Sequence, residues 1–128
     1  MAMFNGAHVL FYSKNPEADR AFLSDVLEFR SVDAGRGWLI FALPPAEIAV
    51  HPTDEDAPQL RADGEVIGAS FYLMCDDLAS TIESLESKDV LCSEINEAPW
   101  GIVTSFRLPS GGEIGLYQPK HPTAFDLR

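Results

Sequence analysis

This 128-residue chain has few basic residues and few cysteines. Nine Lys and Arg stand against 20 Asp and Glu, which gives a formal net charge of −11 at pH 7. Nucleic acids and anionic membrane surfaces attract basic patches, so this balance argues against both as partners. Cys75 and Cys92 are the whole cysteine content, too few for a disulfide framework. Because no secretory signal pattern opens the sequence, we expect two free thiols and a reducing, cytoplasmic setting.

Long apolar runs and the common catalytic motifs are missing as well. No run approaches the about 18 residues of a membrane span, and no Gly-rich phosphate loop, zinc-ligand spacing or Ser/His/Asp order occurs. What the chain does have is 46% hydrophobic and 23% charged residues, a composition typical of one globular domain. We therefore expect a single domain over residues 1–128 and no cofactor.

Two stretches of the sequence nearly repeat each other. Phe41-Ala-Leu-Pro-Pro-Ala-Glu47-Ile in the first half corresponds to Phe106-Arg-Leu-Pro-Ser-Gly-Gly-Glu113-Ile in the second. In each half, an apolar segment followed by a helical pattern precedes the repeated stretch. Self-similarity of this kind is the signature of a duplicated structural unit. The sequence therefore predicts two β-α-β-β-β modules, over about residues 6–52 and about residues 68–119.

The helix starts carry the clearest local signals. Asn15 is a good N-cap and Pro16 suits the first helical position, so a helix should run from Pro16 to about residue 28. Asp77 should cap the second helix, which begins at about Leu78. The predicted strands are 8–12, 29–33, 37–43, 47–51, 70–75, 91–96, 102–108 and 113–117. Residues 52–67 read as the connection between the modules.

Alternation along four of these strands separates two faces of the predicted sheet. One face is almost wholly apolar and should pack beneath the helices: Val9, Phe11, Ile48, Val50, Phe71, Leu73, Cys75, Ile114 and Leu116. The other face mixes aromatic and polar side chains, which is typical of a binding cleft, although a half-solvated sheet face also alternates. The residues that we expect to bind a ligand there are His8, Tyr12, Trp38, Glu47, His51, Ser70, Tyr72, Met74, Trp100, Glu113 and Tyr117.

The order and spacing of these modules resemble the vicinal oxygen chelate superfamily, which includes glyoxalases, extradiol dioxygenases and bleomycin resistance proteins. The segments that carry the resemblance are Gly6-Ala-His8-Val, residues 15–29, Cys75-Asp-Asp-Leu78, Ala98-Pro-Trp-Gly101 and Leu108-Pro-Ser-Gly111. The resemblance implies an α+β fold in which the two modules form an open, U-shaped mixed β-barrel with the helices outside. It also implies a homodimer, because members of the superfamily commonly dimerise.

The metal ligands of the superfamily are mostly absent from this sequence. Its metalloenzymes place one ligand on each of four strands, at positions that correspond here to His8, Ala49, Ser70 and Gly115. Only His8 is a ligand type, and one imidazole would hold a divalent ion little better than water does. We therefore expect no metal. An improvised site remains open, because Glu47, His51 and Glu113 share the predicted ligand face with His8.

The sequence favours a metal-free protein that binds a small, partly apolar or aromatic molecule, in the manner of the bleomycin resistance proteins, over an enzyme. The three tyrosines, with Trp38 or Trp100, would supply contact area, and the His and Glu side chains would orient the ligand. The alternatives are a lyase, isomerase or oxygenase with an atypical metal site or with His8 and Glu113 as acid and base, and a module whose cleft is vestigial. Fold resemblance does not choose among them.

Overall fold

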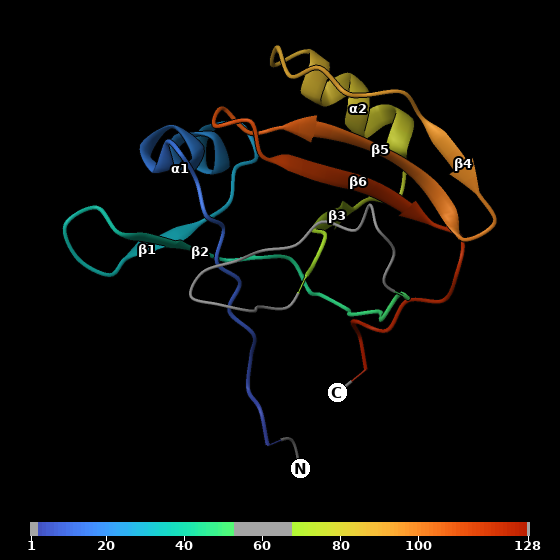
Figure 1. Cartoon of the computed structure of the whole chain (residues 1–128), viewed down its shortest axis with the longest axis horizontal. Coiled ribbons are helices and arrows are strands. Elements are labelled where there is room, and N and C mark those ends of the chain that lie inside the picture. The colour runs from blue at the N-terminus through green and yellow to red at the C-terminus, as the bar shows by residue number, and fades with distance from the viewer. Residues whose placement is uncertain (1–2, 53–67, 128) are drawn as a thin grey trace.

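The computed structural model describes residues 3–52 and 68–127, which form two helices and six strands in two sheets. In chain order the elements are α1 (Pro16–Asp25), β1 (Ser31–Asp33), β2 (Leu39–Phe41), β3 (Tyr72–Met74), α2 (Leu78–Glu86), β4 (Asn96–Ala98), β5 (Gly101–Arg107) and β6 (Glu113–Pro119) (Figure 1). β1 and β2 form a separate antiparallel hairpin. The other four strands form one mixed sheet in the order β3-β6-β5-β4. The fold is α+β, as predicted.

Both helices begin where the sequence predicts. The Asn15 side chain accepts a hydrogen bond from the Ala18 N–H, and Pro16 occupies the first turn of α1. Asp77 accepts from the Ser80 N–H and caps α2 in the same way. The first N–H of α2 is satisfied from the sheet, because Leu78 donates to Oε1 of Gln118 at 2.8 Å and so ties the helix to β6.

The four-stranded sheet is built around β6. β5 pairs with β6 antiparallel over seven residue pairs, and β3 pairs with its other edge in parallel, with Tyr72 opposite Gly115 and Met74 opposite Tyr117. The turn between β5 and β6 closes through a hydrogen bond from the Leu108 N–H to the Gly112 carbonyl. Gly111 has a φ of 101° in this turn, a conformation that favours glycine.

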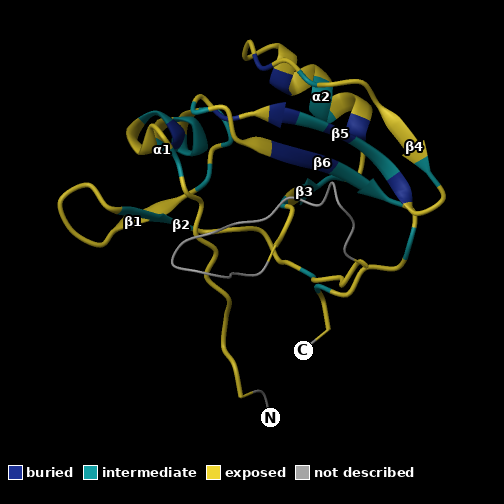
Figure 2. Ribbon diagram, in the orientation of Figure 1, coloured by how far each residue is buried: buried dark blue, intermediate teal, exposed yellow. Residues whose placement is uncertain are grey.

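The buried core lies on the face of this sheet that α2 covers (Figures 1 and 2). Its members come from α2, β5, β6 and the adjoining loops: Leu78, Leu85, Val90, Phe106, Leu108, Ile114 and Leu116. Phe71, Leu73 and Cys75 pack against this cluster, so the apolar face predicted for the second half is confirmed. Cys75 and Cys92 are both free thiols.

Helix α1 also packs against this core rather than against a sheet of its own half. Its apolar side supplies Phe22, Leu23, Val26 and Leu27, and the Phe22 and Phe106 rings lie 5.9 Å apart. On the same helix, the buried Asp19 carboxylate accepts hydrogen bonds from the N–H and hydroxyl of Ser110 at 3.0 and 2.7 Å. The β5–β6 turn therefore holds the first helix in place.

Two predicted strands of the first half are wrong. Residues 8–12 and 47–51 form no regular secondary structure, and Ile48 and Val50 are 93% and 95% exposed. Strands need hydrogen-bonding neighbours, and no strand of the described chain pairs with these segments. The β-α-β-β-β order is therefore complete only in the second half, and the predicted duplication is not confirmed. No closed barrel is found in the described residues. The predicted strand 91–96 is also displaced, because β4 begins at Asn96.

The remaining strands appear within their predicted ranges or within two residues of them, although β1, β2 and β3 are only three residues long. Most of the predicted connection, residues 52–67, lies outside the described residues. Among the described helices, none has the length and apolar character needed to cross a membrane.

Candidate ligand-binding site

The face of the sheet opposite α2 has a different character from the core face. Along β6, Ile114 and Leu116 point into the core, whereas Gly115 and Tyr117 belong to the opposite face. The register places Tyr72 and Met74 on that same face, beside Gly115 and Tyr117. The sequence therefore predicted correctly which side chains of the second half share the open face.

Two glycines make room for aromatic rings on this face. A Cβ atom added at Gly115 would overlap the ring of Tyr72, and one added at Gly101 would overlap the ring of Tyr117. Each tyrosine ring therefore lies directly over the backbone of a neighbouring strand. Gly115 is also the last of the four positions at which the resemblance implies a metal ligand, so an aromatic ring occupies the space beside that position.

Tyr117 is the centre of an aromatic cluster that also contains Tyr72, Trp100 and His121. The ring centroids of these three lie 6.0, 5.6 and 5.6 Å from that of Tyr117, and Tyr72 and Trp100 meet it edge to face. The Tyr117 hydroxyl donates to the Trp100 carbonyl at 3.1 Å, which fixes the ring's outer end. Tyr72 and Trp100 remain 44% and 52% exposed, so the cluster presents apolar surface to a ligand.

Glu47 brings a carboxylate to this cluster from the first half of the chain. Its Oε1 accepts a hydrogen bond from the Ala124 N–H at 2.8 Å, and its Oε2 lies 3.9 Å from Nε2 of His121. The Glu47 side chain is only 19% exposed. Partial burial raises the pKa of Tyr117, and the Glu47 charge raises it further. The carboxylate and the aromatic cluster thus share one site.

An open pocket lies between the same two segments that Glu47 joins. Its volume is about 410 Å³, and its lining residues are Leu43, Pro45, Ala46, Phe125 and Leu127. Figure 1 shows residues 42–52 running below the sheet to meet the C-terminal tail. Because Glu47 follows Ala46 and Ala124 precedes Phe125, the Glu47–Ala124 hydrogen bond stands at the edge of the pocket.

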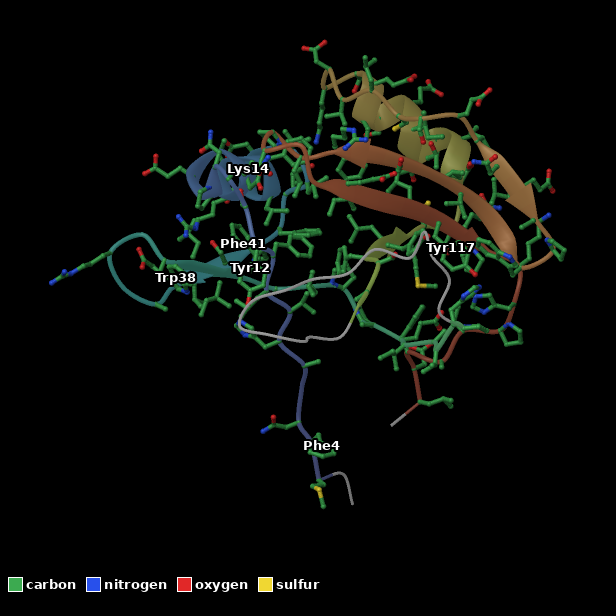
Figure 3. All side chains as sticks on the ribbon, in the orientation of Figure 1. Phe4, Tyr12, Lys14, Trp38, Phe41 and Tyr117 are labelled. Carbon is green, nitrogen blue, oxygen red and sulfur yellow. The ribbon has the colours of Figure 1, made fainter. Side chains whose placement is uncertain are left out.

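The structure does not bring the other predicted ligand-binding residues to this cluster. Tyr12 and Trp38 lie beside α1 and the β1–β2 hairpin, on the other side of the molecule from Tyr117 (Figure 3). The Arg20 guanidinium lies 5.2 Å from the Trp38 ring centroid. Their predicted role in binding is untested.

The polar members of the predicted set are also dispersed. His8, His51 and Ser70 are exposed and lie outside regular structure, and His51 Nδ1 contacts only the neighbouring Pro52 carbonyl, at 2.8 Å. Glu113 shares the open face with Tyr117 but stands at the far end of β6, about 13 Å away by strand rise. Glu47 and Glu113 are therefore not equivalent in the folded chain.

The described residues do not assemble a metal site. Within residues 3–52 and 68–127, no three His, Cys, Asp or Glu side chains gather in a group that could hold an ion. The improvised combination of His8 with Glu47, His51 and Glu113 is thus not formed. The two thiols are poor nucleophile candidates, because burial raises the pKa of both Cys75 and Cys92.

The sequence interpretation missed His121, which packs on Tyr117 and faces Glu47. The sequence predicts no role for the C-terminal tail, because the tail is short and has no strand or helix pattern. The halves do share a His-Pro pair, although the spacing differs, because His51 stands four residues after Glu47 (51 − 47) and His121 eight residues after Glu113 (121 − 113). In both pairs, Nδ1 of the histidine contacts the proline carbonyl, at 2.8 and 2.7 Å.

Comparison with known proteins shows which fold this is. No family model and no curated protein sequence matches the chain. Solved structures do match. One is TnmS3, an antibiotic binding protein from Streptomyces sp. CB03234, at a TM-score of 0.66 and 22% identity over 94% of this chain and 99% of that one.

Two further matches have different descriptions. A lactoylglutathione lyase from Agrobacterium tumefaciens matches at a TM-score of 0.59 and 16% identity, over 91% of this chain and 96% of that one. A glyoxalase/bleomycin resistance protein/dioxygenase superfamily member from Sphaerobacter thermophilus matches at a TM-score of 0.56 and 20% identity, over 91% of this chain and 99% of that one. The chain therefore has the vicinal oxygen chelate fold, as the resemblance predicted. At these identities the likeness establishes the fold alone.

Proposed function

We propose that this protein is a metal-free small-molecule-binding protein that holds a partly apolar or aromatic ligand against the aromatic cluster. The observation that carries the proposal is the seating of Tyr72 and Tyr117 over Gly115 and Gly101, with Trp100 edge-on beside them. Exposed aromatic rings held in fixed positions supply contact area at little conformational cost. An open pocket of about 410 Å³ lies beside the Glu47–Ala124 hydrogen bond.

The structural neighbours support a binding role. TnmS3 is described as an antibiotic binding protein, and it matches nearly the whole of this chain. By analogy, the ligand proposed here belongs to the class of compact organic molecules with aromatic or apolar surface, of which antibiotics are one kind. The analogy supports a ligand class only, and the aromatic cluster is the argument specific to this chain.

The metal-free part of the proposal rests on residue chemistry. Ala49, Ser70 and Gly115 stand at three of the four positions where the resemblance implies ligands. Alanine and glycine have no side-chain donor atom, and a serine hydroxyl is not one of the usual ligands of zinc. We expect calorimetric titrations with zinc, nickel, manganese and iron(II) to show no affinity tighter than about 10 μM. Stoichiometric metal in the purified protein would overturn this part.

The ligand site is tested with a Trp38→Phe variant, in which Trp100 is the only tryptophan. Its fluorescence and the thermal midpoint are followed across a panel of aromatic small molecules, and we expect hits that change both. Tyr72→Ala should then abolish binding, whereas Tyr12→Ala, a matched tyrosine remote from the cluster, should leave it unchanged. Equal losses in the two variants, or no hits, would contradict the proposal. Mass spectrometry of each hit after incubation should show it unaltered, and a product would favour an enzyme instead.

We also propose that the protein is a homodimer in the cytoplasm. The support is the exposed apolar surface of the first half, where Val9, Leu10, Phe11, Ile48 and Val50 are each at least 41% exposed. Clusters of exposed apolar side chains commonly mark association surfaces. Light scattering should give twice the 14.0 kDa mass of one chain. Ile48→Glu should lower that mass, and Leu91→Glu, a control elsewhere on the surface, should not. A monomeric mass would contradict the proposal.

A further inference from the structure

Glu47 is a carboxylate in an unusual setting, because its side chain is only 19% exposed and lies beside the His121 ring, close enough to Tyr117 for its charge to raise the pKa of that phenol. Among the described residues, its hydrogen bonds come from one donor, the Ala124 N–H, and that bond uses Oε1. Oε2 faces the His121 ring at 3.9 Å, which is beyond hydrogen-bond distance. A partly desolvated carboxylate is favourable only when it is well paired, so Oε2 offers a strong acceptor for a positively charged group.

His121 does not serve as that donor while its ring is neutral. Its Nδ1 lies 2.7 Å from the Pro122 carbonyl, and a carbonyl can only accept, so Nδ1 carries the proton of the neutral ring. Nε2 then presents a lone pair toward Glu47 Oε2 rather than an N–H. The packing of the His121 ring against Tyr117 holds it in this orientation. A neutral His121 therefore leaves the negative charge of Glu47 uncompensated.

We infer that the ligand of this site carries a protonated amine, which pairs with Glu47 Oε2 while its apolar body lies on the aromatic cluster or in the adjoining pocket. The inference rests on the proposed small-molecule site and specifies the charge of the molecule that fills it. The faces of the Tyr72, Trp100 and Tyr117 rings carry negative electrostatic potential, which favours an ammonium group near them. The net charge of −11 also raises the local concentration of cations around the protein.

Glu113 offers the matched comparison. It lies on the same face of β6 as Tyr117, carries the same charge as Glu47, and is exposed. If general attraction by the acidic surface determined selectivity, the two carboxylates would contribute alike. If the enclosed setting of Glu47 determines it, only Glu47 matters. Glutamine at either position keeps the size of the side chain, and at position 47 its carbonyl can still accept from the Ala124 N–H.

The experiment compares two probes of nearly equal size, 1-naphthylmethylammonium and 1-naphthylmethanol, by ligand-detected NMR titration at pH 7.5. For the unmodified protein we expect the ammonium probe to bind about tenfold more tightly, roughly 1.4 kcal/mol. Glu47→Gln should remove that preference and leave the affinity for the neutral alcohol within about twofold. Glu113→Gln should leave both affinities within about twofold. Circular dichroism of each variant confirms that it is folded.

The outcomes separate this inference from the proposed function. Binding of both probes with equal affinity would overturn the inference and leave the aromatic site standing. A preference for the ammonium probe that Glu47→Gln preserves, or that Glu113→Gln removes to the same extent, would also overturn it, because the preference would then come from surface charge. Failure of both probes to bind would contradict the proposed site and the inference together.

Discussion

The two halves of this chain carry similar sequence patterns and fold differently. In the second half, the Glu-Ile stretch forms the start of β6, and Ile114 is 3% exposed within the core. In the first half, the matching stretch forms no strand, and Ile48 is 93% exposed. The difference teaches that apolar alternation permits a strand, whereas a strand actually forms where both of its edges and one of its faces find partners.

β6 has all three partners. β5 and β3 satisfy its two edges, and α2 covers its apolar face. Residues 47–50 have none of these partners among the described residues. Their long-range hydrogen bond is the one that the Glu47 side chain accepts from the Ala124 N–H. Helix α1 of the first half does not cover residues 47–50. It packs on the core of the second half instead, and Ser110 holds it there. The halves thus share one core.

The largest test of this comparison is a pair of apolar truncations. Phe106→Ala removes a 2%-exposed core ring that packs against Phe22 of α1, and should lower the free energy of unfolding by about 3–5 kcal/mol. Ile48→Ala should change it by less than about 0.5 kcal/mol. Urea denaturation measures the free energy of unfolding of both variants, at a protein concentration at which light scattering shows monomers. A comparable loss in Ile48→Ala under those conditions would mean that residues 47–50 are buried in the single chain. The proposed difference between the two halves would then be wrong.

A second test concerns the attachment of α1 to the second half. Asp19→Ala removes two hydrogen bonds to Ser110 and leaves the Ser110 N–H without its partner, so we expect a loss of about 1.5–3 kcal/mol in the free energy of unfolding. Asp25→Ala, an exposed acidic residue at the end of the same helix, should cost less than about 0.5 kcal/mol. Equal effects in the two variants would show that helix composition, rather than the Ser110 contact, accounts for the loss.

A third test uses two glycines, one from each half. Gly115→Ala places a methyl group where the Tyr72 ring lies, and we expect it to lower the free energy of unfolding by about 1–3 kcal/mol as the ring is displaced. It should also weaken every ligand that requires Tyr72. Gly6→Ala meets no atom within 4 Å and should alter the free energy of unfolding by only a few tenths of a kcal/mol. If Gly115→Ala left the free energy of unfolding unchanged, the Tyr72 ring would not lie over Gly115 as described.

The parts of the fold that were predictable from the sequence are those set by local chemistry. Asn15 and Asp77 mark helix starts because their side chains accept hydrogen bonds from N–H groups three residues further on, and Pro16 suits the first helical position. Strand parity in the second half was correct because β3 and β6 pair with each other. The strands 8–12 and 47–51 were predicted wrongly because their existence depends on partners that no local pattern reports.

The candidate site was predictable only in part for the same reason. Tyr72, Met74 and Tyr117 follow from parity and register on two paired strands. Trp100 joins them because it immediately precedes Gly101, where β5 begins. Glu47 was named for a strand position that it does not occupy, and it reaches the site through the C-terminal tail instead. His121 was missed because its role requires the tail to return to Tyr117, a long-range contact that the tail's composition does not indicate.

The smallest expected effect is on the ionisation of Tyr117, and it tests the one place where residues 42–52 reach the aromatic cluster. Burial and then the Glu47 charge raise the pKa of Tyr117, so its phenol should ionise at a higher pH than free tyrosine. A spectrophotometric titration of the protein minus that of Tyr117→Phe isolates this group. Glu47→Gln removes the neighbouring negative charge, so the Tyr117 pKa should fall toward the ordinary value without reaching it, because burial remains.

Glu113→Gln provides the control for this titration, since Glu113 lies about 13 Å along the strand from Tyr117. It should leave the Tyr117 pKa unchanged, and 1 M salt should diminish the effect of Glu47→Gln by screening the charge. An identical titration in the protein and in Glu47→Gln would mean that Glu47 does not stay beside Tyr117 in solution. The first half would then lack its contact with the aromatic cluster, and the cluster would be built by residues 68–127 alone.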